Sequence, residues 1–298
     1  MFKPLLAATC EDVEAIKYPV LVSKKLDGVR ATVQAGKLYS RSLKLIPNVH
    51  IQALFSGLEN GLDGELVVGE PCAEDAYRTT VSLVMSDAKP LDFFGDRRVM
   101  YHVFDRYSAA GFQERLKDAT KVIKGKPSVQ IVQHVTVQNA EELSELEVAW
   151  LAEGNEGVMV RSVDGRYKEG RSTIKEGILQ KVKRFIDYEG EVIGTFEMEH
   201  NGNEATTNAL GRTERSSHKE NKTGLGVLGG LILRGIGGVY NGVEFRAGTG
   251  FDATTRLALW KEREDLIGRI AKVKVFPSGS KDRPRHPVWL GFRDKRDM

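Results

Sequence analysis

The pattern of this chain changes near residue 185, and that change constrains the fold more than any other sequence feature. Before it, short runs rich in Val, Leu and aromatic residues alternate with stretches of helical character. After it, Val/Ile/Leu runs separated by glycine are interrupted by one expected helix. The first pattern predicts an α+β domain and the second a small β-barrel. We therefore expect two domains, 1–186 and 187–298.

The expected elements follow from these runs. In the first domain we expect strands at 20–25, 29–33, 62–68, 99–105, 157–161 and 178–183, and helices at 11–17, 74–85, 112–123 and 140–151. Asn139 is expected to cap the last of these helices. In the second domain we expect strands at 191–196, 226–233, 239–245 and 269–276, and a helix at 252–264 capped by Asp252. Residues 200–226 form a polar insert, longer than the roughly 12–15 residues of an ordinary loop.

Charge is informative through its distribution. The formal net charge of +3 is close to neutral, and 29% charged with 41% hydrophobic residues excludes a disordered or fibrous chain. Two segments are basic: residues 161–184 hold eight Lys and Arg against three acids, and residues 272–296 hold eight against two. Such segments form either two walls of a groove for a polyanion or two solvated faces.

No sequence feature points to export or to a membrane. No apolar run approaches the roughly 18–20 residues that cross a bilayer. The N-terminus has only a short apolar stretch before Glu11 and Asp12, too little for a signal peptide. We expect a cytoplasmic protein without membrane partners, in which Cys10 and Cys72 stay reduced.

The strongest local signal is Lys24-Lys25-Leu26-Asp27-Gly28-Val29-Arg30, between two expected strands. A lysine at such a turn can be held rigidly at the edge of a cavity. If it is desolvated or surrounded by cations, its amine loses a proton near neutral pH and becomes a nucleophile. The competing interpretation is a hairpin turn flanked by surface lysines.

Two further signals suit phosphate chemistry. Glu65 and Glu156 each lie in or beside an expected strand, and carboxylates near bases are what a metal-assisted phosphoryl or nucleotidyl transfer needs. Strand alternation places Lys181 and Lys183 on one face, where two ammonium groups favour an anion between them. Exposed glutamates and a solvated strand face remain the alternatives.

Together these segments resemble the ATP-dependent DNA ligase family. They match its motifs in order: Lys25-Leu26-Asp27-Gly28-Val29-Arg30 (motif I), Ser40-Arg41 (Ia), Asp63-Gly64-Glu65 (III), Val103-Phe104-Asp105 (IIIa), Glu156-Gly157-Val158-Met159-Val160-Arg161 (IV) and Lys181-Val182-Lys183 (V). Gly248-Thr249-Gly250-Phe251 resembles the OB-fold domain of the family. The likeness is greatest to its minimal viral, phage and bacterial members.

The resemblance implies an adenylation (nucleotidyltransferase) domain followed by an OB-fold barrel. It implies that Lys25 forms a lysyl-AMP adduct from ATP, with Mg²⁺ or Mn²⁺, and that the AMP then activates the 5′-phosphate of a nick in duplex DNA for sealing. A monomer and a part in DNA replication, repair or recombination are expected. The implied ATP or AMP ligands are Arg30, Arg41, Glu65, Phe104, Lys181, Lys183 and Arg285, with Glu65 and Glu156 toward the metal.

Contacts to DNA are expected from Arg171 and from the insert at about 200–226, which has the position of a duplex-clamping hairpin in minimal members of the family. Its bases are Arg212, Arg215, Lys219 and Lys222. Alternatives stay open at this point. An RNA ligase or an mRNA-capping guanylyltransferase shares motif I, and an inactive nick-binding protein could share the fold.

Overall fold

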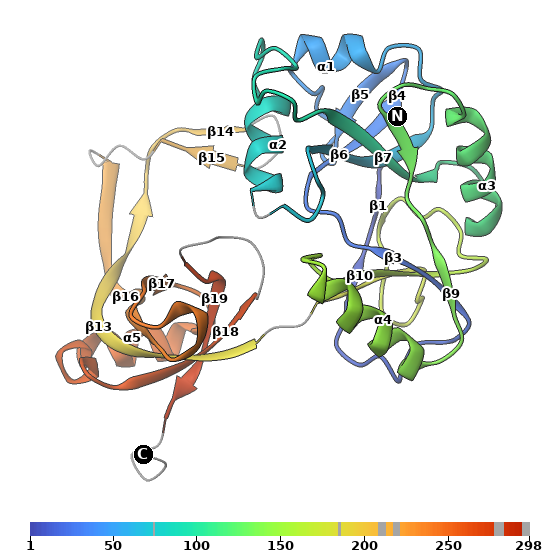
Figure 1. Ribbon diagram of the computed structural model, residues 1–298. Helices are drawn as coiled ribbons and strands as arrows, with labels where there is room; N and C mark the ends of the chain where they lie inside the picture. The colour runs from blue at the N-terminus through green and yellow to red at the C-terminus, as the bar shows by residue number, and fades with distance from the viewer. Residues whose placement is uncertain (74, 184–185, 208–212, 217–220, 277–282, 294–298) are drawn as a thin grey trace. The chain divides into compact units, whose positions relative to one another are not determined.

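Residues 1–183 of the computed structural model form one unit, and most of residues 184–298 form a second (Figure 1). The structure describes every residue except 74, 184–185, 208–212, 217–220, 277–282 and 294–298. For residues 276 and 285 it describes the backbone alone. Each unit has its own apolar core.

The first unit contains two five-stranded sheets. Sheet 1 has the order β5-β4-β6-β7-β8, with β4 at Val29–Gln34, β5 at Lys37–Ser40, β6 at Leu62–Val68, β7 at Val99–Arg106 and β8 at Val129–Ile131. Sheet 2 has the order β2-β12-β10-β3-β9, with β2 at Ala8–Cys10, β3 at Val20–Lys24, β9 at Val135–Val137, β10 at Val158–Ser162 and β12 at Leu179–Val182. All strands of sheet 1 therefore come from one continuous segment of the chain, residues 29–131. The strands of sheet 2 come from the segments before and after it.

Helices complete both layers (Figure 1). The core of sheet 1 takes side chains from α1 (Val49–Leu54), α2 (Ala76–Val84) and α3 (Phe112–Ile123). The core of sheet 2 takes Leu143 from α4 (Ala140–Ala152). The oxygen of the Asn139 side chain accepts the Glu142 N–H, which confirms the expected cap. A short parallel pair, β1 (Leu5–Leu6) and β11 (Gly170–Arg171), adds the N-terminal segment.

The helix expected at 11–17 is wrong. These residues form bends and turns after β2. The Asp12 carboxylate accepts the Glu14 N–H at 3.0 Å, a side-chain turn that competes with helix formation. Pro19 also restricts the backbone of Tyr18 and disfavours helix at that end. The other expected helices of this unit are present, apart from Glu74, which lies outside the described residues.

The second unit is a five-stranded sheet with the order β17-β16-β13-β18-β19. Its strands are β13 (Ile186–Asn201), β16 (Lys222–Ile236), β17 (Glu244–Ala247), β18 (Ile270–Phe276) and β19 (Arg285–Phe292). A parallel bridge joins Thr249, which lies just after the edge strand β17, to Val288 in the other edge strand, β19. The helix α5 (Ala253–Lys261) begins at Asp252, whose carboxylate accepts the Thr255 N–H at 2.7 Å, as expected.

Two expectations for this unit need correction. The strand expected at 239–245 begins only at Glu244, because Gly238–Tyr240 form a 3₁₀ turn that starts from two glycines with positive φ. The last strand, β19, was missed, since Pro284 and Pro287 obscure its alternation.

The polar insert continues the two longest strands of the second unit. β13 runs to Asn201 and β16 begins at Lys222. Between them β14 (Ala205–Thr207) pairs with β15 (Thr213–Arg215). Part of the expected loop is thus strand. Arg212 and Lys219 lie outside the described residues.

Candidate active site

Lys25 lies where the chain crosses from sheet 2 to sheet 1. β3 ends at Lys24 and β4 begins at Val29, and the two strands belong to different sheets, so the hairpin interpretation is wrong. The Lys25 N–H donates to the Gly157 carbonyl at 2.9 Å. Gly28 is required here because a Cβ at this position would collide with the Leu66 carbonyl oxygen. The crossing therefore fixes the Lys25 backbone against both sheets.

Glu156 pairs with two lysines at once. One carboxylate oxygen accepts from Lys25 Nζ and the other from Lys183 Nζ. The three side chains are largely buried, at 19% exposed for Lys25, 8% for Glu156 and 14% for Lys183. Gly157 follows with a φ of 143°, and a Cβ there would collide with the Val182 carbonyl. Two ammonium groups on one carboxylate leave a net positive charge, which suits an anionic ligand.

Lys181 belongs to the same positive region. Burial lowers its pKa, and the charges of Lys25, Arg171 and Arg41 lower it further. Arg171 is exposed and donates from Nη1 to the Ala7 carbonyl at 2.7 Å. Arg41 is exposed directly after β5. The bases predicted from motifs Ia and V and from the Arg171 segment are thus brought near Lys25.

Arg30 and Glu65 stand opposite each other on β4 and β6. Arg30 makes a bidentate ion pair with Asp63, at 2.5 and 2.6 Å. Burial disfavours the Arg30 charge, but attraction to Asp63 outweighs it and raises the Arg30 pKa. Burial also raises the pKa of Glu65 to about 7, although the positive charges of Arg30 and Lys25 oppose the rise. Glu65 is therefore a half-buried carboxyl that titrates near neutral pH.

Phe104 is set apart from the core by a β-bulge. Asp63 pairs with Asp105 and Gly64 with Val103, so Phe104 is the extra residue of β7. Its ring contacts the guanidinium of Arg30 at 4.6 Å and that of Arg161 at 5.4 Å, measured from Cζ to the ring centroid. Phe104 is half-buried among cations and is absent from the described apolar clusters, so it is not a core aromatic residue.

Sequence reasoning missed the buried network behind this ring. Asp105 accepts from Arg115 at 2.7 Å and from Arg161 at 2.8 Å, and Tyr167 donates to Asp63 at 2.6 Å. Arg161 therefore serves an internal ion pair and is not part of a basic groove wall. The burial of Arg115 could have been predicted from the sequence, because Arg115 shares the helical spacing of Phe112 and the other buried residues of α3.

The remaining predicted residues are only partly described. Arg285 opens β19 with its backbone opposite Phe276, and its side chain lies outside the described part. Arg215 donates to the Asn203 carbonyl, and Lys222 lies 3.6 Å from Glu199. Within the described residues, no three His, Cys, Asp or Glu side chains form a group that could hold a metal ion alone.

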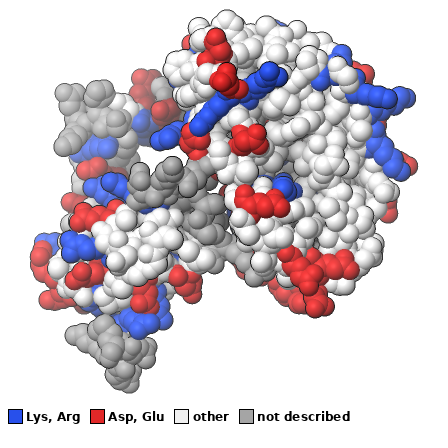
Figure 2. All heavy atoms as spheres, viewed as in Figure 1, with Lys and Arg blue, Asp and Glu red and all other residues white. Residues whose placement is uncertain are grey.

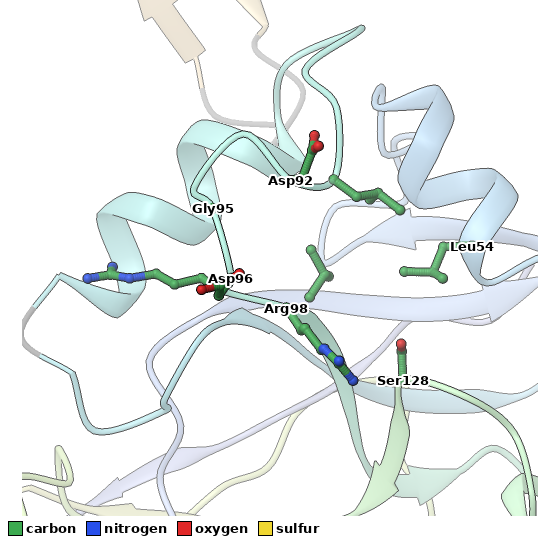
Figure 3. Close-up of a pocket in the computed structure, with 9 residues that line it drawn as sticks. Leu54, Asp92, Gly95, Asp96, Arg98 and Ser128 are labelled. Carbon is green, nitrogen blue, oxygen red and sulfur yellow. The ribbon is translucent and has the colours of Figure 1, made fainter.

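Other surfaces of the first unit differ from the site. Figure 2 shows acidic side chains gathered over α4, where the exposed glutamates are Glu141, Glu142 and Glu145 of the helix and Glu153 directly after it. This face would repel a polyanion. A separate pocket with a volume of about 460 Å³ is lined by residues that include Leu54, Asp92 and Arg98. Figure 3 shows how these side chains lie. The pocket contains none of the predicted site residues.

Comparisons with known proteins identify the family of the chain. The model of the ATP dependent DNA ligase domain matches residues 4–183. The crystal structure of Chlorella virus DNA ligase-adenylate is 33% identical, covers 99% of both chains and superposes with a TM-score of 0.55. A structure from a study of Lig E DNA ligases is 24% identical, covers 98% of this chain and all of its own, and has a TM-score of 0.72, which supports the fold. The chain belongs to the ATP-dependent DNA ligase family.

Curated relatives are longer. The DNA ligase of Saccharolobus shibatae is 28% identical over 221 residues, which is 66% of this chain and 36% of that protein. The chain thus spans about a third of the length of the curated relatives that it matches. In the described part of the chain, no helix is both long and apolar enough to cross a membrane.

Proposed function

We propose that this chain is an ATP-dependent DNA ligase that seals nicks between a 3′-hydroxyl and a 5′-phosphate in duplex DNA. One observation carries the proposal: the largely buried Lys25 amine is held by Glu156 among Lys181, Lys183 and Arg171, in a chain of this family. A buried lysine among cations is suited to attack a phosphate, because the cations stabilise the negative charge of the transition state.

In the first step, Lys25 Nζ attacks the α-phosphorus of ATP, a P–N bond forms and pyrophosphate leaves. Attack requires the neutral amine, and the Glu156 carboxylate that accepts from Lys25 is placed to take the proton. An oxygen of the 5′-phosphate at the nick then attacks the AMP phosphorus, a new P–O bond forms, and the P–N bond breaks so that the Lys25 amine leaves and regains its proton. Finally, the 3′-hydroxyl attacks this phosphate and AMP departs with the bonding pair.

The other residues are assigned to binding. Phe104 stacks on the adenine, and Glu65 contacts the ribose or the metal. Arg30 and Arg41 bind the AMP or the 5′-phosphate of the nick, with Arg171 beside them. Lys181 and Lys183 bind the α-phosphate, and Arg285 acts on the pyrophosphate during the first step.

A divalent cation fits the donors present. Carboxylate oxygens such as those of Glu156 and Glu65 suit Mg²⁺, which is commonly held by one or two carboxylates together with substrate phosphates. This agrees with the lack of a three-ligand protein cluster among the described residues. When bound, such an ion would neutralise phosphate charge; Mg²⁺ or Mn²⁺ would serve.

For the second unit we propose an OB-fold domain, with the boundary near residues 186–187, that binds DNA. Its five-stranded antiparallel sheet and the Thr249–Val288 bridge support this assignment. We propose that the insert at about 200–226 closes around the duplex through Arg212, Arg215, Lys219 and Lys222. A monomer acting in the cytoplasm, or in the host cytoplasm if the chain is viral, completes the proposal.

The test is a sealing assay with a nicked DNA duplex, ATP and magnesium. We expect a ligated strand and an AMP-labelled protein. Labelling by GTP in place of ATP would favour a capping guanylyltransferase, and sealing of nicked RNA alone an RNA ligase. Nick binding without any covalent AMP would identify an inactive nick-binding protein.

A further inference from the structure

Tyr167 is a buried tyrosine that sequence reasoning did not assign. It lies between β10 and β11 and is only 9% exposed. Its hydroxyl donates to Asp63 Oδ2 at 2.6 Å and accepts the Leu5 N–H at 3.3 Å. Burial and the negative charge of Asp63 raise the Tyr167 pKa. The hydroxyl therefore remains a donor to Asp63 across the working pH range.

Asp63 in turn fixes the Arg30 guanidinium. Asp63 is fully buried, and both of its oxygens accept from Arg30. Arg30 Nη2 also donates to the Leu5 carbonyl at 3.1 Å. Tyr167 and Arg30 thus hold Leu5 through its N–H and its carbonyl, respectively. The Arg30 guanidinium donates three hydrogen bonds to two partners, Asp63 and Leu5, and these bonds fix its orientation.

The orientation of the Arg30 guanidinium affects the neighbouring ring of Phe104. The Arg30 guanidinium lies 4.6 Å from the centroid of Phe104, the bulged residue of β7. A planar cation beside an aromatic ring restricts how that ring can turn. The contacts therefore form one path from the Tyr167 hydroxyl through Asp63 and Arg30 to Phe104.

We infer that Tyr167 is a positioning residue of the site: acting through Asp63, it holds Arg30 against Phe104 in the geometry that receives the nucleotide. This inference rests on the proposed function, since Arg30 and Phe104 are assigned there to AMP. It adds the hydroxyl of a residue outside the motifs to the groups that set ATP affinity.

A purely structural role is the competing explanation. The Tyr167 ring makes edge contacts with Phe2 at 5.7 Å and Tyr107 at 5.2 Å between centroids, so its bulk supports the N-terminal segment. Tyr167→Phe keeps this ring and removes only the hydroxyl. Tyr107→Phe is the matched control: Tyr107 packs in the same cluster, but its exposed hydroxyl donates to Glu169 instead.

The experiment measures adduct formation with labelled ATP over a range of ATP concentrations for the full-length protein and both variants. We expect Tyr167→Phe to raise the KM for ATP about tenfold while the maximal rate changes less than threefold. Tyr107→Phe should keep both values within twofold. Equal KM values for wild type and Tyr167→Phe, or equal losses in both variants, would overturn the inference.

A double-mutant cycle with Asp63→Asn tests the path itself. If Tyr167 acts through Asp63, the Tyr167→Phe change should raise KM by less than threefold in the Asp63→Asn background. A full tenfold rise in that background would show that Tyr167 acts independently and contradict the inference. A wild-type protein that forms no adduct would instead contradict the proposed function, and with it this inference, so the two failures are distinguishable.

Discussion

The ion pairs of the two units differ in where they lie. In the first unit the site is built on buried pairs, with Asp105 and Arg115 both fully buried. In the described part of the second unit no ion pair is fully buried; Arg234 is 50% exposed and Glu244 is 58% exposed, at 3.4 Å. Buried charges are costly unless fully paired, whereas exposed pairs contribute little.

This difference fits the two tasks that we propose for the units. A site that forms a covalent bond to one phosphorus atom needs groups held in a single geometry, and buried pairs provide it. A surface that binds a long polyanion needs cations that can exchange partners, and weak surface pairs release them easily. Substitutions in the two units should therefore have different signatures.

The largest expected effect is at Lys25, the proposed nucleophile. Lys25→Ala should reduce formation of the enzyme–AMP adduct by at least about a thousandfold, or about 4 kcal/mol, because no other amine can replace Nζ. Lys24→Ala is the control, since Lys24 pairs with the exposed Glu153 and lies outside the site. Incubation with labelled ATP and magnesium measures both. Labelling of Lys25→Ala at the wild-type level would end the assignment.

The next effect compares stability. Asp105→Ala leaves Arg115 and Arg161 buried without their carboxylate, and the free energy of unfolding should fall by about 3–5 kcal/mol. Arg234→Ala, which breaks only exposed pairs, should cost less than about 1 kcal/mol. Urea unfolding of the intact protein, followed by fluorescence, measures both. Similar losses would contradict the contrast between the units.

Removal of the insert should weaken DNA binding selectively. Replacing the insert, residues 200–226, with a short Gly-Ser turn should raise the dissociation constant for a nicked duplex at least about tenfold, or roughly 1.4 kcal/mol. Adduct formation should stay nearly intact, because Lys25 and its partners Glu156 and Lys183 lie outside the insert. Both are measured at one salt concentration. An unchanged dissociation constant would rule out a clamping role.

The smallest effect is a pH dependence at Glu65. Its raised pKa means that the folded protein holds this proton up to about pH 7, whereas the unfolded chain releases it near the ordinary value of about 4.3. Stability contributed by this group is therefore lost as the pH rises between these values. The shift from about 4.3 to about 7 corresponds to a change of about 2.5 kcal/mol between pH 5 and pH 8, and partial exposure of the carboxyl reduces this to about 1 kcal/mol. Glu65→Gln should therefore gain about 1 kcal/mol of stability over wild type between pH 5 and pH 8.

Thermal or urea unfolding at the two pH values checks this expectation. Glu244→Gln is the control, because an exposed carboxylate loses little solvation on folding. A Glu65→Gln variant whose advantage does not change between pH 5 and pH 8 would show that the carboxyl is not destabilised by burial.

The sequence predicted what depends on local pattern. The strands around Lys25 and Glu65, the helix caps at Asn139 and Asp252 and the motif residues around Lys25 could all be found from spacing and from the family resemblance. These features depend on near neighbours or on chemistry that recurs in fixed motifs.

Other features depend on partners that are distant in sequence. The crossing of Lys25 between two sheets, the Phe104 bulge and the Tyr167–Asp63 contact join residues far apart in the chain. Hydrophobic periodicity carries no information about such pairings. The same reason explains why Arg161 was counted with a basic surface, although it lies in a buried pair.

The interrupted connectivity of sheet 2 sets an order of folding. Sheet 1 has all of its strands once residue 131 has been synthesised, whereas Val22 of β3 lies opposite Val135 and Val160. Closing such long loops is slow compared with local pairing. During synthesis we therefore expect sheet 1 to form before β3 has its neighbouring strands, so that Lys25, the proposed nucleophile, is positioned late. During refolding, the core of sheet 1 should recover its protection from hydrogen exchange before the protein regains reactivity toward ATP.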